Sequence, residues 1–102
     1  MGDVVYLPEV RCTVRRGGLY PNGITVSLTD AQGVEQHIQM ADGMVLESGG
    51  VHYLPVGVAE IRRDERRALV ELPMVADSGY HRIWVGFDAF RRDTLQHAGA
   101  LP

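Results

Sequence analysis

Residues 56–85 read VGVAEIRRDERRALVELPMVADSGYHRIWV. Apolar and polar residues alternate on both sides of an uninterrupted charged run, Arg62 to Arg67. A charged run of this kind between two alternating segments is typical of a solvated turn that joins two strands. Pro73 ends the second strand because proline cannot donate to a β-ladder. After an Ala-Asp-Ser-Gly turn, alternation resumes from His81 to Phe87, which predicts a third strand.

A slip of one residue interrupts the alternation in the first of these strands. Val58 and Ile61 are both apolar, yet strict alternation from Val58 would turn Glu60 toward the core. Such a slip exchanges the two faces of a strand, and a β-bulge is the usual repair. We therefore predict a bulge near Ala59–Glu60.

The rest of the chain follows the same pattern of short alternating segments and turns. Residues 24–28 and 34–40 flank an Asp-Ala-Gln-Gly turn, which predicts a β-hairpin. Gln36 falls on the apolar face of the second segment, so we expect it to lie at a rim or to have a polar partner. The predicted inward set is Val10, Cys12, Val14, Ile24, Val26, Leu28, Ile38, Met40, Leu46, Val58, Val70, Leu72, Ile83 and Val85.

These segments predict an all-β fold, mainly antiparallel. We expect a small SH3-like barrel or sandwich of about five to seven strands, because turn signals recur roughly every 8–12 residues. The pattern changes after Phe87, where Asp88 is placed to cap a short C-terminal helix from Ala89 to about His97. We expect one domain over residues 1–102, with residues 98–102 as a frayed tail.

Composition narrows the function classes. The chain has 102 residues, of which 45% are hydrophobic and 23% charged, as in an ordinary globular domain. Its net charge of −3 argues against general binding to nucleic acids or anionic membranes.

All ten cationic residues are arginine, which we attribute to the codon bias of a GC-rich, bacterial-type genome. Cys12 is the only cysteine, so neither a disulfide within the chain nor a cysteine-based zinc site is expected. No apolar run reaches the length of a membrane span and no leader pattern is evident, so we expect a cytoplasmic protein without membrane contact.

Residues 44–72 have an ordered succession of apolar alternation, Ser-Gly, a strand, a polar turn and a further strand. Its elements are carried by Met44, Leu46, Ser48-Gly49, Val58, Ile61 and Val70. This succession resembles a KOW-type segment of SH3-like small β-barrels. Two features depart from that pattern: the family's central glycine falls at Val56, one residue before Gly57, and the basic residues between the glycines are replaced by Val-His-Tyr-Leu. KOW segments resemble modules that contact RNA or ribosomal and transcription proteins, and the resemblance implies a small barrel more than it implies nucleic-acid binding.

Trp84 marks a second apolar face. It alternates with Ile83 and Val85, so it faces away from the core if they face inward, and Leu69 is out of phase with Val70 in the same way. An apolar face must be covered. We favour cover by the terminal helix or the N-terminal arm. The alternative is a docking or self-association surface, because tryptophan, tyrosine and arginine dominate interface energies. Its candidate residues are Trp84, Arg82, Tyr53, Tyr80 and Leu69.

The charged turn also has two interpretations. Its four arginines are Arg62, Arg63, Arg66 and Arg67, and four guanidiniums on one tip could clamp the phosphates of a nucleic acid. The alternative is a solvated tip whose charge is offset by acidic neighbours, namely Glu60, Asp64, Glu65 and Glu71. We favour the solvated tip, because most charged runs on a surface are solvated.

Catalytic and metal chemistry have little support in the sequence. The four histidines show no metal-binding spacing, although His52, His81 and Asp77 could assemble a site in space. Ser48 and Ser78 lie in glycine turns without a nucleophile motif. We therefore expect no catalytic residue, metal or cofactor, and no enzyme. The expected function is an interaction module that binds a protein partner or itself through the Trp84 face; the alternative is a nucleic-acid-binding barrel that uses the arginine turn.

Overall fold

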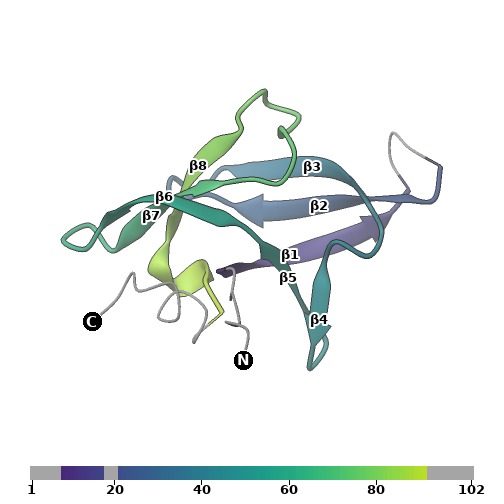
Figure 1. Ribbon diagram of the computed structural model, residues 1–102, viewed down its shortest axis with the longest axis horizontal. Coiled ribbons are helices and arrows are strands. Elements are labelled where there is room, and N and C mark those ends of the chain that lie inside the picture. Colours follow the sequence, from purple (N-terminus) through teal and green to yellow (C-terminus); the bar gives the residue numbers. More distant parts are fainter. Residues whose placement is uncertain (1–7, 18–20, 92–102) are drawn as a thin grey trace, which may run out of the picture.

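The computed structural model describes residues 8–17 and 21–91, which form an antiparallel all-β domain (Figure 1). The all-β prediction is confirmed, although the described residues hold eight strands where five to seven were expected. The strands are β1 (Glu9–Arg16), β2 (Gly23–Thr29), β3 (Glu35–Ala41), β4 (Leu46–Ser48), β5 (Val51–Pro55), β6 (Gly57–Arg62), β7 (Arg67–Glu71) and β8 (Arg82–Gly86).

The strands form two sheets that share one core. The larger sheet has the order β3-β2-β1-β5-β4, and the smaller has the order β6-β7-β8. Only Val56 separates β5 from β6, so the chain passes from one sheet to the other at this residue. Val56 is buried, and its N–H donates to the carbonyl of Pro8 at 2.9 Å. The β6–β7 hairpin projects at the left of Figure 1, away from β1, β2 and β3.

The predicted hairpin over residues 24–40 is confirmed as β2 and β3, with Val26 opposite Ile38. Asp30 builds its turn: carboxylate oxygen Oδ1 accepts the backbone N–H groups of Gln32 and Val34, each at 2.9 Å. Gly33 has a φ of 81°, in the left-handed region that favours glycine. Alternation and turn chemistry together therefore specify this element locally.

The predicted bulge in β6 is confirmed. Val58 pairs with Val70, but the next registered pair is Glu60 with Leu69, so Ala59 is the extra residue. The bulge restores Ile61 to the inner face, where it packs against the core.

The core confirms most of the predicted inward set. Val14 and Val58 are only partly buried, and Leu46 is wrong because it is 43% exposed on the three-residue outer strand β4. The predicted inward set also omitted several buried residues, which are Leu54, Val56, Ala68 and Ala76.

The predicted helix does not begin at Ala89. Residues Phe87–Ala89 form a single 3₁₀ turn, and Phe90 is extended, with φ −78° and ψ 144°. Phe90 instead makes an antiparallel bridge to Val10, which buries its ring without a helix. The remainder of the predicted helix and the predicted frayed tail lie outside the described residues.

Candidate functional site

Trp84 lies on the outer face of the β6–β7–β8 sheet, as its alternation predicted. Its neighbours Ile83 and Val85 are buried, whereas Trp84 is half-buried. Leu69 on β7 is its registered partner and is also half-buried. The second apolar face expected from the sequence is therefore this Leu69–Trp84 pair.

Two arginines of the hairpin cover the Trp84 ring. The guanidinium carbon of Arg67 lies 4.9 Å from the ring centre, and that of Arg62 lies 5.2 Å from it. A guanidinium over an indole is attracted by the negative face of the ring. The arginine turn and the Trp84 face, which the sequence suggested as two separate sites, therefore belong to one surface. The N-terminal arm, one of the two covers expected from the sequence, lies outside the described residues. Of the expected terminal helix only residues 89–91 are described, and they do not continue as a helix.

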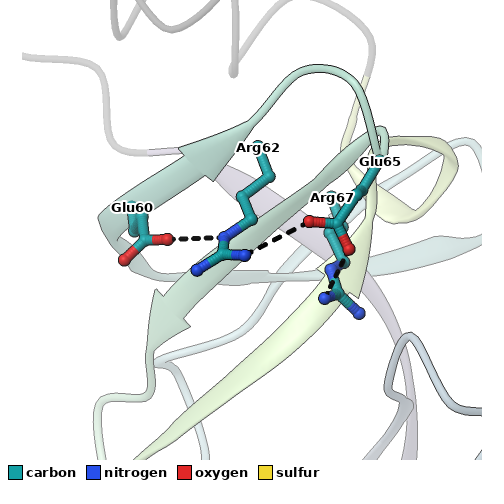
Figure 2. Close-up of polar contacts among 4 residues, drawn as sticks. All are labelled: Glu60, Arg62, Glu65 and Arg67. Atoms are coloured by element: carbon teal, nitrogen blue, oxygen red, sulfur yellow. Dashed lines mark hydrogen bonds and ion pairs between the residues drawn. The ribbon is translucent and has the colours of Figure 1, made fainter.

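Two glutamates fix the arginines in place (Figure 2). Arg62 Nε donates to Glu60 Oε2 at 2.8 Å, and Arg62 Nη1 donates to Glu65 Oε2 at 3.3 Å. Glu65 Oε1 also pairs with Arg67 Nη2 at 2.6 Å. The hydrogen bond to Glu60 and, as a smaller contribution, the hydrogen bond to Glu65 raise the pKa of Arg62 above its ordinary value. The series of contacts Glu60–Arg62–Glu65–Arg67 therefore holds both guanidiniums over the indole.

The charges on this face balance. Arg82 pairs with Glu71 at 3.3 Å across β8 and β7, so three arginines on the face are matched by Glu60, Glu65 and Glu71. At the tip, the guanidinium carbon of Arg66 lies 5.5 Å from the centre of the Phe87 ring. Of the four arginines of the turn, Arg62 and Arg67 are thus paired with carboxylates, and Arg66 lies over an aromatic ring.

A hollow of about 230 Å³ opens beside Trp84. Three of the five predicted partner-binding residues, Trp84, Tyr80 and Arg82, line it, and Leu69 lies next to Trp84 in the sheet. Tyr53 is not part of this site: it lies on β5 in the other sheet, with the guanidinium carbon of Arg91 5.2 Å from its ring centre. The other side chains at the hollow are Ile83, Asp30, Gln32 and Gln36.

The β2–β3 hairpin contributes Asp30, Gln32 and Gln36 to the lining of the hollow. Gln36 is 4% exposed; its Nε2 donates to Asp30 Oδ2 at 3.2 Å, and its Oε1 accepts from Ser78 Oγ at 2.7 Å. This confirms the prediction that Gln36 has a polar partner. The Ala31 N–H donates to the Trp84 carbonyl at 2.7 Å, which ties the turn to β8. Sequence reasoning missed Asp30 as a site residue because only the fold brings it to Trp84.

A second hollow and one buried thiol lie outside the Trp84 surface. A second hollow of about 380 Å³ lies over β1 and β2 and includes Cys12. Desolvation raises the pKa of the Cys12 thiol to about 11, so the thiol is protonated at neutral pH. Among residues 8–17 and 21–91, no three His, Cys, Asp or Glu side chains are placed to share a metal ion. None of the described segments is a helix of the length and apolarity needed to span a membrane.

Comparisons with known proteins leave the likeness of residues 44–72 to a KOW-type segment as a prediction. No family model matches the chain, and no curated protein or solved structure is significantly similar to it.

Proposed function

We propose that this chain is a non-catalytic interaction module that binds a protein partner, or a second copy of itself, through the surface around Trp84. The observation that carries the proposal is the meeting of Trp84, Tyr80 and Arg82 around one hollow. These three residue types are the ones most often found at the energetic centre of protein interfaces.

The arrangement of the arginines supports binding at this face. A long side chain loses rotamer freedom when a partner immobilises it, which costs about 0.5–1.5 kcal/mol. Arg62 and Arg67 are already held by Glu65 and by the indole before any partner arrives. Binding of a partner to this face therefore requires little further loss of side-chain entropy from these two arginines, because folding has already ordered them.

The polar groups at the hollow support binding more than catalysis. Gln36 is hydrogen-bonded to both Asp30 and Ser78, and these bonds hold the hairpin and the loop in place. General acid–base or nucleophilic catalysis needs a reactive group that is aimed at a substrate and has a matched pKa. The buried, protonated thiol of Cys12 lies in the other hollow and does not meet that requirement.

The alternative of nucleic-acid binding draws less support from the same contacts. Phosphate binding would have to compete with the carboxylates that already pair with Arg62 and Arg67. The face is balanced in charge and the whole chain carries −3, whereas nucleic-acid binders usually present an excess of positive charge.

Comparative capture tests the proposal. Tagged wild-type chain, Trp84→Ser and Tyr53→Ser are incubated with the same lysate, and bound proteins are compared quantitatively; sedimentation of the free chain reports self-association. We expect a specific partner, or the dimer, to be retained by wild type and Tyr53→Ser and lost from Trp84→Ser. Tyr53→Ser is the matched control because its aromatic side chain lies on the other sheet.

Thermal unfolding must accompany the capture, because Trp84 is half-buried and Trp84→Ser could unfold the chain. Tyr80→Ser is the second variant for that case, since Tyr80 is 61% exposed and lines the same hollow. The proposal is wrong if folded Trp84→Ser and Tyr80→Ser both retain every wild-type interaction.

A further inference from the structure

We infer that the hollow beside Trp84 receives a cationic side chain, lysine or arginine, from the protein partner. The inference rests on the proposed function and specifies what the partner must present. Three groups carry it: the carboxylate of Asp30, the exposed ring of Tyr80 and the indole of Trp84.

Asp30 supplies a negative charge that no cation offsets within the described ranges. Oδ1 accepts two backbone N–H groups and Oδ2 accepts the amide of Gln36, all of which are neutral donors. No ion pair joins Asp30 to any cation in the described part of the chain. Arg82, which also lines the hollow, directs Nε and Nη2 to Glu71, so its charge is already balanced.

The aromatic rings favour the same kind of ligand. Two guanidiniums of this chain already lie within cation–π distance of the Trp84 ring, and the same residue borders the hollow. Tyr80 is 61% exposed at the same hollow, and no cation of the described segments lies over its ring. A cation that enters here would lie beside Tyr80 while it approaches Asp30.

The groups are held in place before binding. The bond from the Ala31 N–H to the Trp84 carbonyl fixes the Asp30 turn against β8. The loop that carries Tyr80 is held by the bond from the Ala76 N–H to the Tyr80 carbonyl, at 2.9 Å, and by Ser78 on Gln36. A hollow of about 230 Å³ is smaller than the sites that enclose drug-sized ligands, which suits a single inserted side chain.

The charge of the whole chain works in the same direction. A net charge of −3 attracts a cationic partner and repels an acidic one during diffusional encounter. Lysine and arginine both satisfy the carboxylate and the rings, and the test below distinguishes them.

The test is a titration of isotope-labelled chain with capped pentapeptides of sequence GGXGG, in which X is arginine, lysine, norleucine or glutamate. Trp84 is the only tryptophan, so its indole N–H gives one unambiguous NMR signal. We expect the arginine and lysine peptides to shift this signal and the Tyr80 and Ile83 amides in a saturable way. The norleucine peptide, matched in length to lysine, and the glutamate peptide should leave them unchanged.

Asp30→Asn is the decisive variant because it removes the charge and keeps an oxygen for the two backbone N–H groups. Its amide nitrogen replaces the oxygen that accepts from Gln36, so the amide spectrum of the free variant must first show that the turn is intact. Loss of one charge-assisted contact should weaken binding of the cationic peptides about tenfold. Asp42→Asn is the matched control: it makes the same change in net charge, at a carboxylate that pairs with Arg16 away from the hollow. Its affinity for the peptides should equal that of wild type.

The inference is overturned if the norleucine peptide binds as well as the arginine peptide, if Asp30→Asn binds like Asp42→Asn, or if no saturable shift occurs at the Trp84 indole. The outcome that would contradict the cationic ligand differs from the outcome that would contradict the proposed function. Partner capture that depends on Trp84 but is unchanged in Asp30→Asn leaves the interaction module intact and removes only the cationic ligand.

Discussion

The guanidinium carbon of Arg67 lies 4.9 Å from the centre of the Trp84 ring, on the side of the sheet that faces away from the core. Arg67 and Trp84 come from adjacent strands, and Glu65 holds the guanidinium by an ion pair of 2.6 Å. Arg67 Nε is buried and has no acceptor in the described part of the chain, so the pair with Glu65 and the contact with the indole position this side chain. An outward-facing tryptophan is thereby shielded by neighbouring long side chains.

Removal of the arginine cover should expose the indole. We expect Arg67→Ala, and the double variant with Arg62→Ala, to shift tryptophan emission to longer wavelength and to increase acrylamide quenching. The single tryptophan makes both readouts specific. Arg16→Ala, which removes an exposed arginine paired with Asp42, is the control and should leave emission unchanged. Unchanged quenching in the double variant would contradict the shielding role.

Leu54 and Leu46 form a matched pair on adjacent strands. Leu54 is fully buried on β5, whereas Leu46 is 43% exposed on β4. We expect Leu54→Ala to lower the free energy of unfolding by about 2–5 kcal/mol, and Leu46→Ala to change it by only about 0.5 kcal/mol. Urea unfolding of the two variants measures the difference, and equal losses would show that the core has been assigned wrongly.

Gly33 tests the turn that positions Asp30. Its φ of 81° is unfavourable for residues with a side chain, although an added Cβ would meet no atom within 4 Å. Gly33→Ala should therefore cost about 1–2 kcal/mol through backbone strain alone. Gly33→Asn should cost less because asparagine tolerates this region. Thermal unfolding compares the two, and an alanine variant as stable as wild type would be incompatible with this turn geometry.

Cys12 should give the chain an alkaline sensitivity. The folded thiol has a pKa of about 11 because burial disfavours the thiolate, against 9.0 for an unperturbed thiol. As pH rises above 9.0, the unfolded chain loses its thiol proton first, so the free energy of unfolding falls until the pH passes about 11. Cys12→Ala should lack this part of the pH dependence. Urea unfolding across this range measures it, and parallel profiles for the two proteins would refute the assignment.

Nucleic acids should bind weakly or not at all. Because Arg62 and Arg67 are paired with carboxylates, we expect titration with mixed RNA and DNA oligomers to leave the amides of residues 62–67 unshifted. Shifts that cluster there, weaken with added salt and vanish in the Arg63→Glu, Arg66→Glu variant would instead establish the nucleic-acid alternative.

Features that depend on local sequence were predictable. Alternation with Asp-Ala-Gln-Gly specified the β2–β3 hairpin, and the spacing of Val58 and Ile61 specified the bulge. The outward direction of Trp84 followed from its buried neighbours Ile83 and Val85. Each of these is a consequence of period-two geometry or of turn chemistry within a few residues.

Features that depend on contacts distant in sequence were not predictable. Nothing local shows that Phe90 would pair with Val10 instead of beginning a helix. The register of β7 with β8 brings Arg67 near Trp84, and the packing of the β2–β3 turn on β8 brings Asp30 to the same hollow. Both Tyr53 and Tyr80 were expected as binding residues because of their residue type. The sheet order shows that Tyr53 lies on the larger sheet, whereas Tyr80 lines the hollow beside Trp84.

The hydrogen bond from the Ala31 N–H to the Trp84 carbonyl also bears on aggregation. β8 is an outer strand of its sheet, and outer strands present backbone groups that can recruit another chain. The β2–β3 turn occupies this carbonyl, so one turn both presents Asp30 and obstructs strand addition at β8. Damage to that turn would disrupt the proposed ligand site and would also open the edge of β8 to pairing with another chain, so loss of the proposed binding and aggregation would occur together.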